Sequence, residues 1–142
     1  MSESQNLGFL LHDYRDRVMG VRHVIALSSD GILVAHDGSL PDDVAQRLAA
    51  ATSGLVSLLR GLGDQVGAGS CSHTLTEYAG GFMLVMGAGQ GGALVAFAER
   101  TCDMGAVSFE LAQLVNRVGD VLIPAARAAM SGGLASLTGS GR

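Results

Sequence analysis

The chain has 142 residues, of which 48% are hydrophobic and only 15% charged, and its net charge is −4. This length is typical of one domain with a substantial core, and the composition excludes an intrinsically disordered chain. All nine basic residues are Arg, and so few cations with a negative net charge argue against binding to a nucleic-acid backbone.

The cysteines and the apolar segments indicate the compartment. Cys71 and Cys102 fit no disulfide framework or metal-ligand spacing, which is typical of a reducing compartment. The N-terminus, MSESQNLGFLL, carries an acid where a signal peptide carries a base. Residues 78–98 are uncharged and long enough to cross a bilayer, but glycines divide them into two short apolar runs. Two buried strands explain that segment better than a membrane helix, so we expect a cytoplasmic protein.

The first third of the chain predicts a helix and a β-hairpin. Apolar residues recur at helical spacing over residues 7–18, and Gly20 ends this helix. Residues 21–28 and 32–36 read as two strands. Gly31 lies in the tight turn between them, where a residue without Cβ adopts a positive φ at no steric cost.

The second helix begins at Ser39, which we expect to cap it, with Pro41 in the first turn and acids at the positive end of the helix dipole. It runs to about Leu62, where Gly61 and Gly63 end it. The expected helix is therefore long enough to cross a whole sheet.

Three further strands and a last helix complete the pattern. The strands are predicted at residues 70–78, 82–86 and 93–98, and the first of these has the polar composition of an edge strand. Asp103 opens the last helix, which Pro124 ends or kinks.

The order helix, two strands, helix, three strands, helix predicts an α/β (α+β) fold with a five-stranded, mostly antiparallel sheet and helices on both faces. We expect residues 1–130 to form a single domain. Residues 131–142 are rich in Gly and Ser and read as a flexible tail.

This order and three stretches of sequence resemble the Roadblock, or dynein light chain-type, domain family. The stretches are residues 24–35 with their Asp-Gly turn, residues 75–85, and residues 103–115 with 117–119 and 122–127. The last stretch is similar to the subfamily encoded beside small Ras-like GTPases in high-GC Gram-positive bacteria. The resemblance implies a Roadblock/profilin-like sheet with strand order 2-1-5-4-3, whose central strands are the first, fifth and fourth.

The resemblance also implies a function without catalysis. Family members are homodimers that pair their third strands and second helices, and they bind and regulate small Ras-like GTPases. A sensor kinase-like membrane protein and a small adaptor are the further partners it implies, with recruitment to the membrane through partners rather than direct membrane insertion. We expect no cofactor, no metal and no nucleic acid.

The second helix offers two apolar rows on adjacent faces. We expect the sheet to be covered by the first row, which comprises Val44, Leu48, Ala51, Leu55, Leu58, Leu59 and Leu62. The second row has small side chains and is predicted to remain open for a second helix. With the edge strand it gives the predicted dimer interface: Ala45, Ala49, Thr52, Val56, Leu59, His73, Leu75 and Glu77.

Two motifs that suggest chemistry have simpler explanations. The run from Gly87 to Gly92 fits the letters G-x-G-x-x-G, but it leads into a predicted strand instead of the helix that a phosphate site requires. Cys71, His73 and Glu77 share one strand face, where polar contacts at a dimer seam are favoured over catalysis or metal binding. We therefore predict no catalytic residue.

Phe9 and Phe109 lie off the apolar stripes of the first and last helices. Either they are exposed for a partner or the two helices lie side by side and cover them, and covering is the simpler expectation. The alternative to a signalling platform is a small-ligand-sensing module of profilin/PAS-like architecture, which requires a pocket lined by apolar and a few polar groups. An enzyme is a third and weaker hypothesis.

Overall fold

The computed structural model describes residues 3–88 and 91–119. The elements in chain order are α1 (Glu3–Arg17), β1 (Val21–Leu27), β2 (Leu33–His36), α2 (Asp42–Gln65), β3 (His73–Tyr78), β4 (Gly81–Gly87) and β5 (Ala93–Glu99). A further helix occupies residues 104–119. Pro124 and the predicted tail, residues 131–142, lie outside the described residues.

The five strands form one antiparallel sheet in the order β2-β1-β5-β4-β3. This confirms the predicted order, with β1, β5 and β4 in the centre. Those three strands are almost continuously buried, as expected where helices cover both faces. The two glycine predictions near β1 also hold, because Gly20 follows α1 with φ +91° and Gly31 turns the β1–β2 hairpin with φ +81°.

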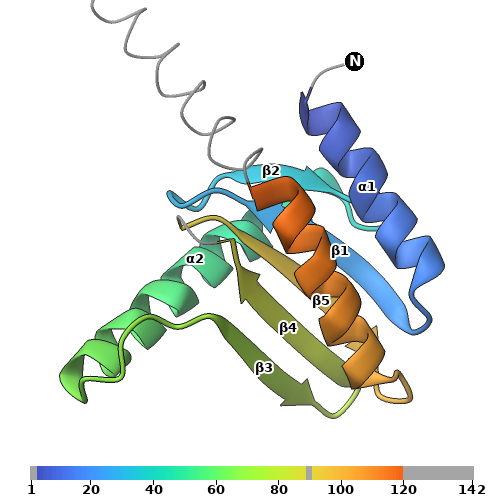
Figure 1. The fold of residues 1–142 in the computed structure, drawn as a ribbon. Coiled ribbons are helices and arrows are strands. Elements are labelled where there is room, and N and C mark those ends of the chain that lie inside the picture. The colour runs from blue at the N-terminus through green and yellow to red at the C-terminus, as the bar shows by residue number, and fades with distance from the viewer. Residues whose placement is uncertain (1–2, 89–90, 120–142) are drawn as a thin grey trace, which may run out of the picture.

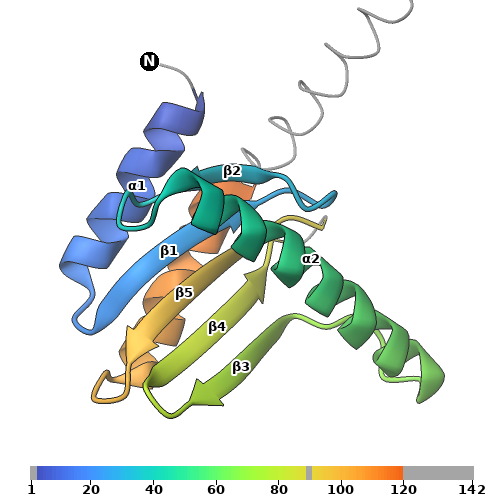
Figure 2. The ribbon, with the colours of Figure 1, turned by 180° about the vertical axis from the view of Figure 1, so that it is seen from behind.

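The helices lie in two layers. Figure 1 shows α1 and the helix at residues 104–119 side by side on one face of the sheet, and Figure 2 shows α2 alone on the other. The first layer buries Leu7, Leu11, Tyr14, Val107 and Leu111. The buried Tyr14 hydroxyl joins the two helices by donating a hydrogen bond to the carbonyl oxygen of Val107 over 2.9 Å, and burial raises the pKa of Tyr14.

Helix α2 differs from its prediction at both ends. Pro41 is the residue before its first turn, with no side-chain cap, while the Ser39 hydroxyl donates to Asp37 instead. At the other end, Gly61 and Gly63 lie inside the helix, which continues to Gln65. Gly63 is needed for another reason: a Cβ there would lie 2.8 Å from the carbonyl oxygen of Gly69, where the chain returns over the helix.

The β3–β4 turn depends on a close approach of two backbones. A Cβ on Gly81 would lie 2.2 Å from the carbonyl oxygen of Ala98 in β5. We expect Gly81→Ala to lower the free energy of unfolding by about 1–3 kcal/mol, because the strands must move apart. Gly80→Ala is the matched control, since a Cβ there meets nothing within 4 Å. Urea unfolding monitored by circular dichroism measures both, and equal stabilities would contradict the packing of β4 on β5.

Candidate interaction surface

The two rows of α2 are placed only partly as predicted: Leu48 and Leu55 of the first row pack against the sheet cluster, but residues of the second row, Ala45, Ala49, Thr52 and Val56, face inward with them. Ala45 and Ala49 are fully buried and Thr52 is 5% exposed, and all three are the buried residues of this helix. Leu58 and Leu62, which we expected to cover the sheet, are 70% and 65% exposed. The prediction that the small-residue row remains open is therefore wrong, because the buried face of α2 extends from Leu48 and Leu55 round to Ala45, Ala49 and Thr52.

The physical reason is how the volumes of helix and sheet fit together. The sheet face beneath α2 carries bulky side chains, including Ile25, Leu27 and Val95. Small residues on the helix let its backbone approach these side chains closely, and close packing without voids decides which row faces inward. Hydrophobicity alone would favour burial of the leucines against the sheet.

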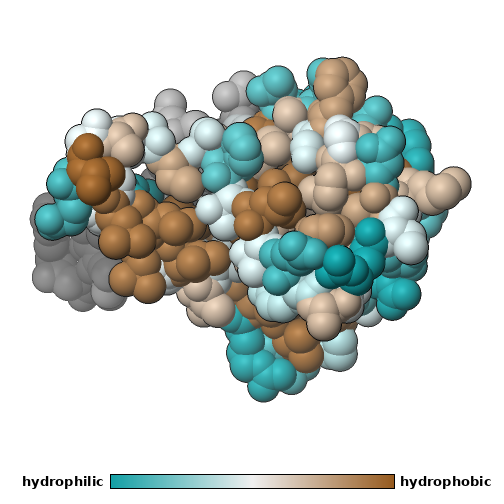
Figure 3. All heavy atoms as spheres, turned by 90° about the horizontal axis from the view of Figure 1, so that it is seen from below, coloured by the Kyte–Doolittle hydropathy of each residue, from teal (hydrophilic) through white to brown (hydrophobic). Residues whose placement is uncertain are grey.

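The displaced row gives α2 an exposed apolar face. We call Leu58, Leu62 and Val66, which immediately follows the helix, the leucine row, and each of them is exposed. In Figure 3 hydrophobic side chains gather on the side of the molecule where the C-terminal half of α2 lies. Exposed apolar area of this kind, on an otherwise well-buried fold, marks an interaction surface.

Strand β3 lies beside this face and forms the edge of the sheet. Among the described strands it pairs only with β4, so its outer backbone groups have no strand partner. Thr74 and Thr76 pair with Val85 and Met83, which pack toward α2. Side chains on a strand alternate between the two faces, so the predicted interface residues His73, Leu75 and Glu77 point away from α2.

On that second face, Glu77 already has a partner in its own chain. Its carboxylate lies 2.9 Å from the guanidinium of Arg100. The same guanidinium lies 5.7 Å from the centre of the Phe82 ring. The contact between Glu77 and a second copy that the sequence suggests would therefore compete with this ion pair.

Phe9 and Phe109 are 68% and 62% exposed, so the expectation that their helices cover them is wrong. The two helices do lie side by side, joined by the ion pair between Arg17 and Glu110 at 2.8 Å. Both phenylalanines point away from the sheet because each lies opposite the buried stripe of its own helix.

The motifs that suggested chemistry are not assembled into a reactive site. The glycine run connects β4 to β5, with Gly92 accepting a hydrogen bond from the backbone of Ala88. The Cys71 thiol lies 3.6 Å from the carbonyl oxygen of His73, while the His73 ring contacts the Ser72 hydroxyl. The thiol therefore has no imidazole base. Among the described residues, no group of three His, Cys, Asp or Glu could hold a metal ion.

A buried polar network that the sequence analysis missed holds α1 to the first hairpin. Asp37 is 6% exposed, and its carboxylate accepts from the backbone of Val24 and from the Ser39 hydroxyl. The Arg15 guanidinium lies 3.1 Å from its other oxygen. His23 contacts Ser39 at 2.7 Å, and burial lowers the pKa of His23. Nothing in the local pattern around Asp37 distinguishes it from a surface acid, because its partners lie in three separate segments.

In the part of the chain that the structure describes, no helix combines the length and apolar character needed to span a membrane. This agrees with the division of residues 78–98 into strands β4 and β5 in place of a membrane helix.

Comparisons with known proteins agree with this architecture. A Roadblock/LC7 domain structure from Streptomyces avermitilis is 31% identical, covers 82% of this chain and 97% of its own, and has a TM-score of 0.76. Myxococcus xanthus MglB is 16% identical over 85% of this chain and 90% of its own, with a TM-score of 0.77. The gliding protein MglB from Thermus thermophilus is 14% identical over 86% and 92%, with a TM-score of 0.74. The two MglB structures show the shared fold.

A search of curated proteins finds no match. The family model for the Roadblock/LC7 domain matches residues 9–98. This range contains the whole of α2 and β3, which carry the exposed surface described above. The chain therefore belongs to the Roadblock/LC7 domain family.

Proposed function

We propose that this protein is a non-enzymatic, homodimeric signalling platform that binds and regulates a small Ras-like GTPase. The observation that carries the proposal is the leucine row of α2, exposed next to the unpaired edge of β3. A Roadblock-type regulator is what membership of the family supports, and its members are generally regulatory or adaptor domains.

Two features on one side of the molecule support the proposed dimer: the unpaired backbone edge of β3 and the exposed leucine row. The outer edge of β3 presents backbone donors and acceptors, and pairing with β3 of a second copy would satisfy them. The leucine row would be buried against its counterpart, because a twofold axis brings the same patch of both subunits together. One related fold, 15% identical, is a structure of MglB with tetrameric arrangement, which supports self-association as a property of this architecture.

This surface replaces part of the interface expected from the sequence. Ala45, Ala49 and Thr52 are buried in their own chain and are unavailable to a partner. Val56 and Leu59 are half-buried beside the leucine row, and His73, Leu75 and Glu77 are exposed on β3. The interface we propose therefore consists of the leucine row, these two half-buried residues and the edge of β3.

The absence of catalysis in the proposal is supported by the way the polar side chains are used. Cys71 contacts a carbonyl oxygen, Asp37 holds secondary structure together, and Glu77 pairs with Arg100. Regulation would then act through the GTPase's own residues, and a sensor kinase-like membrane protein and a small adaptor are the other partners we propose.

The test is GTP hydrolysis by a small Ras-like GTPase, measured with and without this protein. We expect the purified chain to form a complex with the GTPase, seen by light scattering, and to change its rate of GTP turnover several-fold. The chain alone should release no phosphate from GTP. If neither a complex nor a change in turnover is seen at tens of micromolar, the proposed function is wrong, whatever the oligomeric state.

A further inference from the structure

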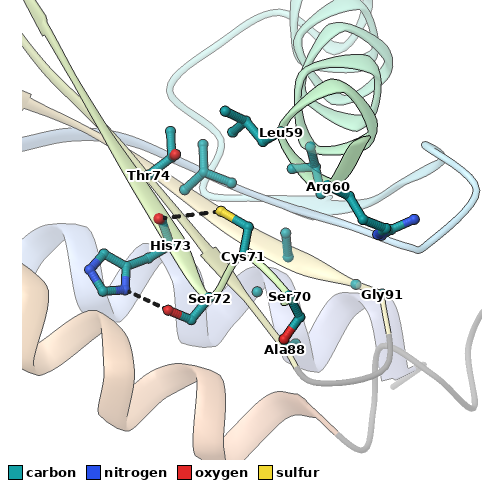
Figure 4. Close-up of a pocket in the computed structure, with 14 residues that line it drawn as sticks. Leu59, Arg60, Ser70, Cys71, Ser72, His73, Thr74, Ala88 and Gly91 are labelled. Atoms are coloured by element: carbon teal, nitrogen blue, oxygen red, sulfur yellow. Dashed lines mark hydrogen bonds between the residues drawn. The ribbon is translucent and has the colours of Figure 1, made fainter. Parts of the chain in front are cut away.

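A cavity of about 330 Å³ lies beneath the C-terminal half of α2. Its walls come from three places: α2, the segment that leads into β3, and the adjoining ends of β4 and β5. Figure 4 shows Leu59 and Arg60 on the helix, Cys71 and Ser70 below them, and Thr74 across the pocket from Arg60. Its size is near the lower end of the range for small-molecule sites.

The cavity exists because small residues leave space where the helix departs from the sheet. Gly87, Ala88 and Ala93 close one end of the pocket, and none has a long side chain to fill it. The wall at residues 70–72 is fixed in place, since the carbonyl oxygen of Ser72 accepts a hydrogen bond from the backbone of Gly87 over 2.9 Å. The pocket is therefore formed within a single chain.

Its charge is unusual for this protein. No Asp or Glu lines the pocket, although the chain carries a net charge of −4. Arg60 is the one arginine among the lining residues. Among the described residues no carboxylate lies within 4 Å of the Arg60 guanidinium, whereas the other arginine of α2, Arg47, pairs with Asp43 at 3.7 Å. Arg60 therefore offers an uncompensated positive charge.

The remaining walls combine apolar surface with one unused side-chain donor. Val56, Leu59 and Val85 supply hydrocarbon. The Thr74 side chain lies on the α2 side of its strand, and within the described part of the chain its hydroxyl makes no side-chain hydrogen bond. The His73 ring, by contrast, points away from the pocket and contacts Ser72 (Figure 4).

We propose that this pocket binds a small aliphatic carboxylate. A guanidinium binds a carboxylate through two parallel hydrogen bonds, and one uncompensated cation matches one negative charge. A short hydrocarbon body fits against the apolar walls formed by Val56, Leu59 and Val85. A phosphate dianion is a poorer match because a single Arg supplies only half of the neutralising charge.

The test is titration of the full-length, 15N-labelled protein with hexanoate, followed by amide chemical shifts. We expect a dissociation constant on the order of 1 mM, as for a ligand of this size, with shifts at residues 56–60, 70–74, 85–88 and 91–93. Hexanamide, which has the same body without the charge, should bind about tenfold more weakly. Arg60→Gln should weaken hexanoate by about tenfold, and Arg47→Gln, on the same helix outside the pocket, should leave it unchanged.

The proposal would be overturned if hexanamide bound as tightly as hexanoate, or if Arg60→Gln bound hexanoate as tightly as the parent. Chemical shift changes spread outside those residues would also overturn it. So would an Arg60→Gln variant that loses self-association yet still binds hexanoate, because Arg60 would then serve the interface between copies. Binding is measured on the chain alone, so the result stands or falls independently of any GTPase.

Discussion

Ala49→Arg should prevent the protein from folding. Ala49 is fully buried between α2 and the sheet, among side chains that include Ile25 and Val95. A guanidinium there would have neither space nor a carboxylate partner. An unpaired buried charge costs about 3–5 kcal/mol, and forcing extra volume into a packed core adds about 1–3 kcal/mol, against a net stability of about 5–15 kcal/mol for an ordinary domain. The expected result is loss of the cooperative thermal transition seen by circular dichroism.

Ala50→Arg is the matched control for this prediction. Ala50 is the next residue of the same helix and is exposed, so the same substitution should leave the melting temperature within a few degrees of the parent. The pair of variants distinguishes two placements of α2. If Ala49→Arg folds and merely dissociates a dimer, the small-residue row is at the interface, as the sequence pattern suggests, and the packing described above is wrong.

Most element positions could be predicted because they depend on local signals, whereas the strand order was implied by the family resemblance. Apolar runs without alternation identify β1, β4 and β5 as central strands, and Gly31 marks the hairpin by a turn that needs positive φ. The polar alternation of β3 likewise identifies an edge. These signals lie within the element itself, so no knowledge of the opposite side of the core is needed.

The orientation of α2 could not be predicted in the same way. Which of two adjacent rows is buried depends on the volume of the side chains opposite, and those come from β1, β4 and β5. A preference for burying leucine over alanine predicts Leu48 and Leu55 correctly but misses Ala45 and Ala49, because small residues let the helix approach the large sheet residues closely. Asp37 was missed for a similar reason, since its partners Arg15, Val24 and Ser39 are distant in sequence.

Exposure of Phe9 and Phe109 shows a second limit of periodicity. The helical pattern correctly places both opposite the buried stripes, but it does not say whether a neighbouring helix reaches round to cover them. In the structure α1 and the helix at residues 104–119 contact each other through Tyr14 and the Arg17–Glu110 ion pair. Neither helix covers the outer surface of the other, so both phenylalanines stay exposed.

The double variant Leu58→Glu, Leu62→Glu should be a folded monomer where the parent is a dimer. The two side chains are one helical turn apart and are 70% and 65% exposed in the single chain, so the fold does not depend on them. A twofold interface would bury four such leucines, and each fully buried leucine contributes about 1.5–3 kcal/mol. Placing four carboxylates there instead should weaken the dimer by at least about 100-fold.

The chain provides a close control in Ser57→Glu, Gly61→Glu. These positions have the same spacing, precede the leucines by one residue, and are exposed, and a Cβ on Gly61 meets nothing within 4 Å. The control therefore adds the same charges to the same helix about 100° away from the leucine row. Light scattering at tens of micromolar, with circular dichroism to confirm folding, should report a monomer for the first variant and a dimer for the second. A dimer in both, or a parent that is already monomeric, would remove the leucine row from the interface and leave the edge of β3 as its only physical support.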